Sequence, residues 1–175
     1  MGSYVLTWKP LAGGHLAIGH KPGRKLRDQL EQQGCTMVVS LLSHTESSAE
    51  ENERRIRLPL AGADLPKPER TPEILATFER MHAALREGGR VYLHCSAGLH
   101  RTGLIANAFL RWLGFSAEEA LARIAELRPL TAEKVGEERL RWGDGFARPS
   151  IDQRSSSTCE DDHPAMSRHQ DASSA

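Results

Sequence analysis

Two side chains with complementary chemistry, Cys95 and Arg101, have five residues between them. A deprotonated cysteine is a strong nucleophile, and an arginine side chain can hold two oxygens of a tetrahedral anion at once. Gly98 lies between the two residues and Gly103 follows them, so the backbone has room to turn its N–H groups inward. The spacing therefore indicates a site where a thiolate meets a bound phosphate-like anion.

The elements on either side of this segment are expected to position it. Arg90–His94 is a short apolar run typical of a buried strand, and an apolar helix is expected to continue to Leu113. The amino end of a helix offers unpaired N–H groups and a partial positive charge, which should lower the pKa of Cys95. Thr102 is expected to donate its hydroxyl to the sulfur, and His94 to fix the loop by hydrogen bonding.

The segment from His94 to Gly103 resembles the phosphate-binding loop of the cysteine-dependent protein-tyrosine phosphatase superfamily, H-C-x-x-G-x-x-R-[ST]-G. The small, dual-specificity-like branch is most similar, and the resemblance extends over about residues 16–146. It implies a phosphocysteine intermediate formed by Cys95, with Arg101 on the phosphoryl oxygens, and no metal or other cofactor. It also implies that the loop binds substrate through Ser96, Ala97, Gly98, Leu99, His100 and Arg101, with His94 and Gly103 in support.

The same resemblance implies a general acid on a mobile loop about thirty residues before the cysteine. Asp64 lies 31 positions before Cys95 and is the one aspartate between Asp28 and Asp144. We therefore predict that Asp64 protonates the leaving oxygen and then activates water as a carboxylate. Glu69, in the same 61–70 loop, is the second candidate.

Two features depart from the family pattern. Many relatives carry a late glutamine or asparagine that positions the attacking water, whereas this chain offers Glu133, Glu137 and Glu138 there. No upstream tyrosine loop is evident either, so a shallow binding site is expected. A shallow site would accept phosphotyrosine and also phosphoserine or phosphothreonine.

Strands and helices are expected to alternate along the chain, which predicts an α/β fold. We expect one layered domain over residues 1–148, with a central, largely parallel sheet flanked by helices. The expected strands span residues 4–8, 15–19, 36–42, 55–60 and 90–94, and the expected helices span 24–33, 71–87, 104–113, 116–127 and 131–142. Residues 149–175 are rich in Ser and Asp with few apolar residues, which predicts a disordered tail.

Composition and charge limit the classes of partner and the location that we expect for this protein. Lys plus Arg (23) equals Asp plus Glu (23), so no overall positive field favours nucleic acid. The best apolar stretch, 104–113, is interrupted by Arg111 and predicts no membrane span. Three scattered cysteines fit a reducing cytoplasm. Whether Cys35 approaches Cys95 and protects it as a disulfide stays open, and the sequence does not indicate the oligomeric state.

We therefore predict a phosphatase that acts on phosphorylated proteins or small phosphoesters, and three alternatives stand beside this prediction. Sulfur transferases and arsenate reductases also use cysteine loops, but their loop length or chain order differs. A phosphate-binding module without turnover is a second alternative. The third keeps the chemistry but changes the substrate to a phosphoinositide, a nucleotide or an RNA 5′-phosphate, and basic residues around the site would favour it.

Overall fold

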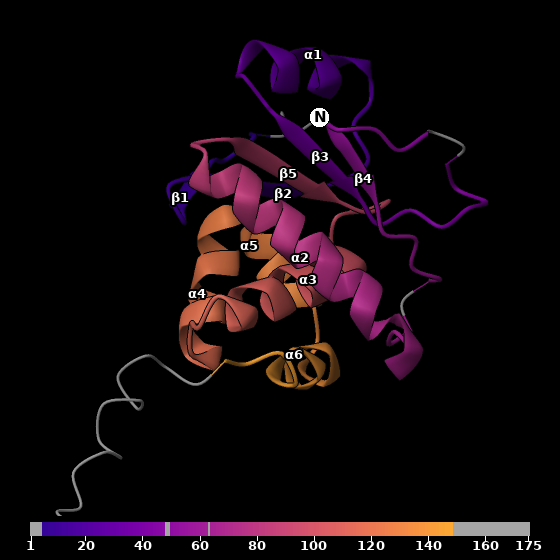
Figure 1. The fold of residues 1–175 in the computed structure, drawn as a ribbon, viewed down its shortest axis with the longest axis vertical. Helices are drawn as coiled ribbons and strands as arrows, with labels where there is room; N and C mark the ends of the chain where they lie inside the picture. Colours follow the sequence, from indigo (N-terminus) through magenta and orange to yellow (C-terminus); the bar gives the residue numbers. More distant parts are fainter. Residues whose placement is uncertain (1–4, 48–49, 63, 149–175) are drawn as a thin grey trace, which may run out of the picture.

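The computed structural model describes residues 5–47, 50–62 and 64–148 (Figure 1). The strands that it contains are β1 (Lys9–Leu11), β2 (Gly14–Gly19), β3 (Met37–Ser40), β4 (Arg55–Arg57) and β5 (Arg90–His94). The helices are α1 (Arg24–Gln32), the 3₁₀ helix η1 (Pro68–Arg70), α2 (Thr71–Arg86), α3 (His100–Trp112), α4 (Ala117–Leu127), α5 (Pro129–Lys134) and α6 (Glu137–Asp144).

The five strands form one sheet in the order β1-β2-β5-β3-β4. All neighbouring pairs are parallel except β1 with β2, which form an antiparallel hairpin. Gly19 and Ser40 both lie opposite His94, so the carboxyl ends of β2, β3 and β5 reach the same edge of the sheet. The prediction of a largely parallel central sheet is confirmed, and this edge is where such sheets bind ligands.

Helices cover both faces of the sheet (Figure 1). The helix α1 packs Leu26 and Leu30 against Tyr92 on one face. On the other face, α2, α3 and α4 bury a larger core that includes Phe78 and Phe109 against the alternate side chains of the strands. The sheet is therefore buried on both faces, as its apolar strands require.

Several element boundaries differ from the sequence-based expectation. The described residues of the expected strand 4–8 are not in a strand, and the first strand begins at Lys9. The helix expected over 131–142 is two helices, because Gly136 adopts a φ of +83° between α5 and α6. The predicted tail lies outside the described residues. Among the helices that the structure does describe, none is both long and apolar enough to cross a membrane.

The question of whether Cys35 can protect Cys95, which the sequence left open, is answered by the fold. The Cys35 thiol lies 3.6 Å from the Arg90 carbonyl oxygen, at the amino end of β5, whereas Cys95 follows the carboxyl end of that strand. Five residues of extended chain separate these two ends by about 16 Å. A disulfide requires the two Cα atoms to lie within about 7 Å, so these cysteines cannot be joined in this fold.

Candidate active site

The loop from Cys95 to Arg101 joins the carboxyl end of β5 to the amino end of α3. Backbone hydrogen bonds fix it from both neighbouring strands. On one side, the Lys21 N–H donates to the Ser96 carbonyl (3.0 Å), and on the other the Leu41 N–H donates to the His94 carbonyl (2.8 Å). The loop is therefore anchored by the segments that follow β2 and β3 as well as by its own strand.

The Cys95 sulfur is only slightly exposed and lies among hydrogen-bond donors. The Gly98 N–H donates to it at 3.2 Å. Burial by itself would raise the pKa of Cys95, but the Thr102 hydroxyl and the backbone N–H groups of Thr102, Gly98 and Leu99 outweigh it, so this pKa is lowered. The Thr102 hydroxyl is buried and no oxygen or nitrogen of the described residues bonds to it, so it is available to the sulfur. The environment thus favours the thiolate, the nucleophilic form of cysteine.

Gly98 gives the loop its inward-facing backbone. Its φ is +73°, and a Cβ atom at this position would overlap the backbone of Gly19. Its carbonyl oxygen points away from the sulfur and accepts hydrogen bonds from Thr131 Oγ1 and Arg128 Nη1, both at 2.6 Å. The Gly98 carbonyl shares a peptide plane with the Leu99 N–H, so these donors keep that N–H turned towards Cys95. Arg128 Nη1 also donates to the Ala97 carbonyl at 3.0 Å, which shares a plane with the Gly98 N–H. The sequence analysis did not identify Arg128 or Thr131.

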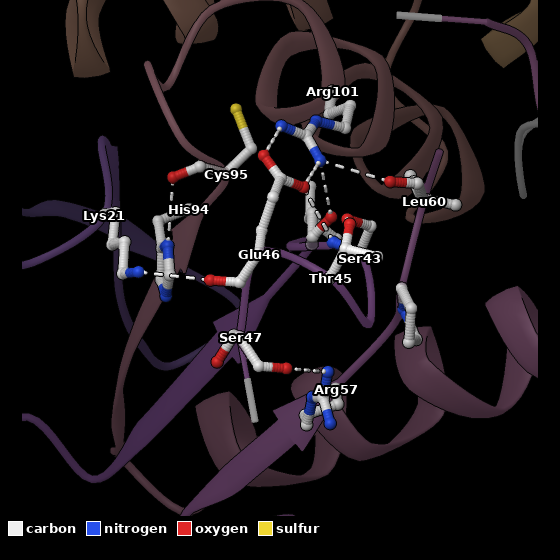
Figure 2. Close-up of polar contacts among 12 residues, drawn as sticks. Lys21, Ser43, Thr45, Glu46, Ser47, Arg57, Leu60, His94, Cys95 and Arg101 are labelled. Atoms are coloured by element: carbon white, nitrogen blue, oxygen red, sulfur yellow. Dashed lines mark hydrogen bonds and ion pairs between the residues drawn. The ribbon is translucent and has the colours of Figure 1, made fainter. Parts of the chain in front are cut away.

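Arg101 is held by three segments of the chain (Figure 2). Its Nη1 donates to the Leu41 carbonyl (3.3 Å), the Leu60 carbonyl (3.1 Å) and Glu46 Oε2 (2.6 Å), and its Nη2 donates to Glu46 Oε1 (2.8 Å). The carboxylate and the guanidinium therefore form a bidentate pair, which fixes the plane of the arginine. Only 11% of the Arg101 side chain and 33% of the Glu46 side chain are exposed.

This pairing decides which face of the arginine can meet a ligand. The Arg101 hydrogen bonds lower the pKa of Glu46 to about 2, and the same contact raises the pKa of Arg101. Nε–H and the second hydrogen of Nη2 lie on one edge of the guanidinium, away from the carboxylate, and no oxygen of the described residues accepts them. Cys95 lies close enough to contribute to the raised pKa of Arg101. The free donor pair and the sulfur can thus act on one bound anion.

Glu46 is the functional residue that the sequence analysis missed. Its Oε2 also accepts a hydrogen bond from the Ser43 N–H at 2.8 Å. Ser43 and Glu46 form an S-x-x-E pattern directly after a strand, which is a signature of a local capping interaction. That pattern could have indicated the turn, but it carries no information about an arginine 55 positions away.

His94 and Gly103 lie at the two ends of the loop. His94 Nδ1 lies 3.1 Å from the Cys95 carbonyl oxygen, and its ring stacks on Tyr92 at 5.7 Å. Burial lowers the pKa of His94 to about 4, so the ring is neutral at physiological pH. A Cβ atom at Gly103 would press on the Val135 side chain at 2.7 Å, so this glycine allows α3 to approach the chain beyond α5.

The remaining predicted residues are mostly exposed. Ser96, Ala97 and His100 are exposed and Leu99 is half-buried. Asp64 is exposed in the 61–70 loop and has no hydrogen-bond or ion-pair partner among the described residues, and Glu69 is exposed in η1. Two of the late glutamates pair with basic side chains instead of the loop: Glu133 with Lys134, and Glu137 with Arg141.

Comparisons with known proteins give the same assignment as the geometry. The model of the dual specificity phosphatase catalytic domain matches residues 16–136. The tyrosine-protein phosphatase CDC14 of Candida albicans is 28% identical over 114 residues, which are 63% of this chain but only 20% of that protein. The dual specificity phosphatase 28 of Mus musculus is 25% identical over 122 residues, 69% of this chain and 74% of that protein.

Solved structures agree on the fold. The crystal structure of Tk-PTP in its active form superimposes with a TM-score of 0.60 at 22% identity, over 78% of this chain and 95% of that one. Human DUSP28 gives a TM-score of 0.59 at 21% identity, over 79% and 96%. The family resemblance that was based on residues 94–103 is confirmed, because the family model spans well over half of the chain and contains the loop. This chain belongs to the dual specificity phosphatase catalytic domain family.

Proposed function

We propose that this protein hydrolyses phosphate monoesters through a phosphocysteine intermediate on Cys95, with phosphotyrosine in proteins as its main substrate and phosphoserine and phosphothreonine as further substrates. The observation that carries the proposal is the geometry of the loop. The Gly98 N–H donates to a sulfur whose pKa is lowered, and the edge of Arg101 away from Glu46 bonds to no oxygen of the described residues and interacts with that sulfur.

The first step transfers the phosphoryl group to sulfur. The Cys95 thiolate attacks phosphorus and forms the S–P bond, while the ester P–O bond breaks. The leaving oxygen takes a proton from the Asp64 carboxylic acid, which becomes a carboxylate. Arg101 and the loop N–H groups stabilise the charge on the equatorial oxygens during this transfer.

The second step restores the enzyme. Water attacks phosphorus and gives a proton to the Asp64 carboxylate, and the S–P bond breaks to release inorganic phosphate. The sulfur leaves as a thiolate, and the Thr102 hydroxyl and the surrounding N–H groups that lower the pKa of Cys95 make it a better leaving group. All groups that this cycle uses belong to the chain itself.

The proposal extends to the organisation and location of the protein. Residues 1–148 form the phosphatase domain and 149–175 a separate tail. Among the described residues no cysteine lies close enough to pair with Cys95, and a reactive thiolate is best preserved in a reducing compartment, so we place the protein in the cytoplasm.

Leaving-group dependence tests the roles of the cysteine and the acid together. Wild type, Cys95→Ser, Asp64→Asn and Glu69→Gln should be compared on an activated aryl phosphate and on an alkyl phosphate, in the presence of a chelator. Cys95→Ser should abolish turnover while phosphate still binds. Asp64→Asn should slow the alkyl substrate about 10²-fold or more and the aryl substrate far less, because a poor leaving group needs the proton. Equal losses on both substrates would contradict the acid role, and a selective alkyl defect in Glu69→Gln would assign that role to Glu69.

A further inference from the structure

A cleft of about 500 Å³ opens beside the candidate active site. Among the residues that line it are His44, Glu51, Arg57, Leu60, Arg70 and Glu73. It adjoins the site directly, because the carbonyl oxygen of Leu60 accepts a hydrogen bond from Arg101. A peptide whose phosphorylated side chain reached Cys95 would therefore pass close to this cleft.

Some charged residues of the cleft have an oppositely charged partner, and Arg57 has none among the described residues. Glu51 forms an ion pair with Arg80, and Glu73 forms one with Arg70. The half-buried guanidinium of Arg57 has no carboxylate partner among the described residues, and its one hydrogen bond runs from Nη2 to the Ser47 carbonyl at 2.9 Å (Figure 2). Its Nε–H is buried and bonds to nothing within the part of the chain that the structure describes. Arg57 is thus the arginine of the cleft lining that lacks a carboxylate partner among the described residues.

The sheet register sets how far the backbone of Arg57 lies from the strand that leads into the Cys95 loop. Arg57 and His94 both lie opposite Ser40, one on each side of β3. Two strand spacings separate their Cα atoms, a distance of about 9.5 Å. An extended peptide advances about 3.3 Å per residue, so this separation corresponds to two or three residues.

We propose that Arg57 and this cleft form a subsite for an acidic side chain that lies two or three positions from the phosphorylated residue of a protein substrate. The proposal rests on the proposed phosphatase function and deepens it, since it names the chemistry of the preferred sequence. A carboxylate in the cleft would satisfy the unused Nη donors of Arg57 and compensate its charge. Because the chain has a formal net charge of zero, any preference for acidic peptides must come from a local group of this kind.

The test uses two phosphotyrosine peptides that differ only at the positions two and three residues before and after the phosphotyrosine. One peptide carries glutamate at these positions and the other carries glutamine. In the wild-type protein, kcat/KM should be about tenfold higher for the glutamate peptide. The ratio between the two peptides should fall to about one in Arg57→Gln and keep part of its value in Arg57→Lys. Because each ratio is measured within one variant, a general change in activity cancels.

Arg54→Gln is the matched control, since it removes the same charge from an exposed arginine that does not line the cleft. It should keep the tenfold ratio. Equal rates on both peptides in the wild type, or the same loss of the ratio in both glutamine variants, would overturn the subsite.

If neither peptide is hydrolysed while an aryl phosphate is, the protein substrate and the subsite both fail but the phosphocysteine chemistry stands. If inositol phosphates are preferred and Arg57→Gln removes that preference, Arg57 recognises a lipid headgroup and the peptide subsite is overturned.

Discussion

The ion pair between Glu46 and Arg101 can be tested with one conservative substitution. Glu46→Gln keeps the shape of the side chain but removes its charge, so that one of the two contacts, now 2.6 and 2.8 Å long, must be lost or reversed. The guanidinium would then be oriented mainly by the carbonyls of Leu41 and Leu60. We expect Glu46→Gln to lower both the stability of the fold and the rate of phosphate transfer.

The pKa of Glu46 gives the size of the effect on stability. A fall from 4.5 to about 2 corresponds to about 3 kcal/mol. A third of the Glu46 side chain is exposed, at 33%, so solvent screening reduces the expected value to about 1 to 2 kcal/mol. The looser arginine should lower kcat/KM for an aryl phosphate about tenfold, since a transition-state contact of 1.4 kcal/mol is worth that factor.

The pH dependence gives a second, independent readout. Because the folded-state pKa of Glu46 lies below the unfolded value, its contribution to stability is complete above pH 4.5 and is lost as the pH falls towards 2. The difference in free energy of unfolding between wild type and Glu46→Gln should therefore shrink over this interval.

Urea unfolding at pH 7 and at pH 3, together with initial rates at pH 7, would measure these effects. Glu53→Gln is the control, because Glu53 is exposed and forms no ion pair among the described residues. It should change the free energy of unfolding by less than about 0.5 kcal/mol. Wild-type stability and activity in Glu46→Gln would refute the view that the pair orients Arg101.

Three further substitutions test the loop itself. Arg101→Lys should reduce turnover of an aryl phosphate by at least about 10²-fold, measured as initial rates, because an ammonium group cannot hold Glu46 and two phosphoryl oxygens in one plane. Gly98→Ala should lower both the melting temperature and the activity, since its φ of +73° costs an alanine about 1–2 kcal/mol and the new Cβ overlaps Gly19. Thr131→Val should cost about 1–3 kcal/mol in urea unfolding, because it leaves the Gly98 carbonyl with one donor fewer. An unchanged unfolding midpoint in Thr131→Val would show that this contact does not hold the loop.

The local part of the site could be predicted from the sequence because it is continuous in the chain. Cys95, Gly98 and Arg101 belong to one loop, and the strand and helix around them follow from apolar patterns. The general layout of the sheet follows from the alternation of strands and helices. The prediction of one helix over 131–142 was wrong for a local reason. The apolar pattern of this segment did not show that Gly136 would adopt a positive φ and divide it.

The rest of the site could not be predicted because it depends on which strands are neighbours. Glu46 lies 55 positions from Arg101, and Arg128 and Thr131 lie 30 and 33 positions from Gly98. Neither the strand order nor the parallel register can be read from a periodic pattern. The same limit explains why the sequence left the pairing of Cys35 open: Cys35 precedes a strand next to β5 but lies at the end of β5 opposite to Cys95.

Arg101 connects the segments that this topology brings together. Its Nη1 bonds reach Leu41 after β3, Glu46 in the following turn, and Leu60 at the start of the segment that carries Asp64. Because one planar group makes all of these contacts, moving it towards a bound phosphate would pull on both neighbouring segments. In the proposed mechanism, the arginine thus has two functions that a charge alone could not serve. It would bind the substrate through one edge, and through the other it holds the start of the segment that carries the proposed acid, Asp64.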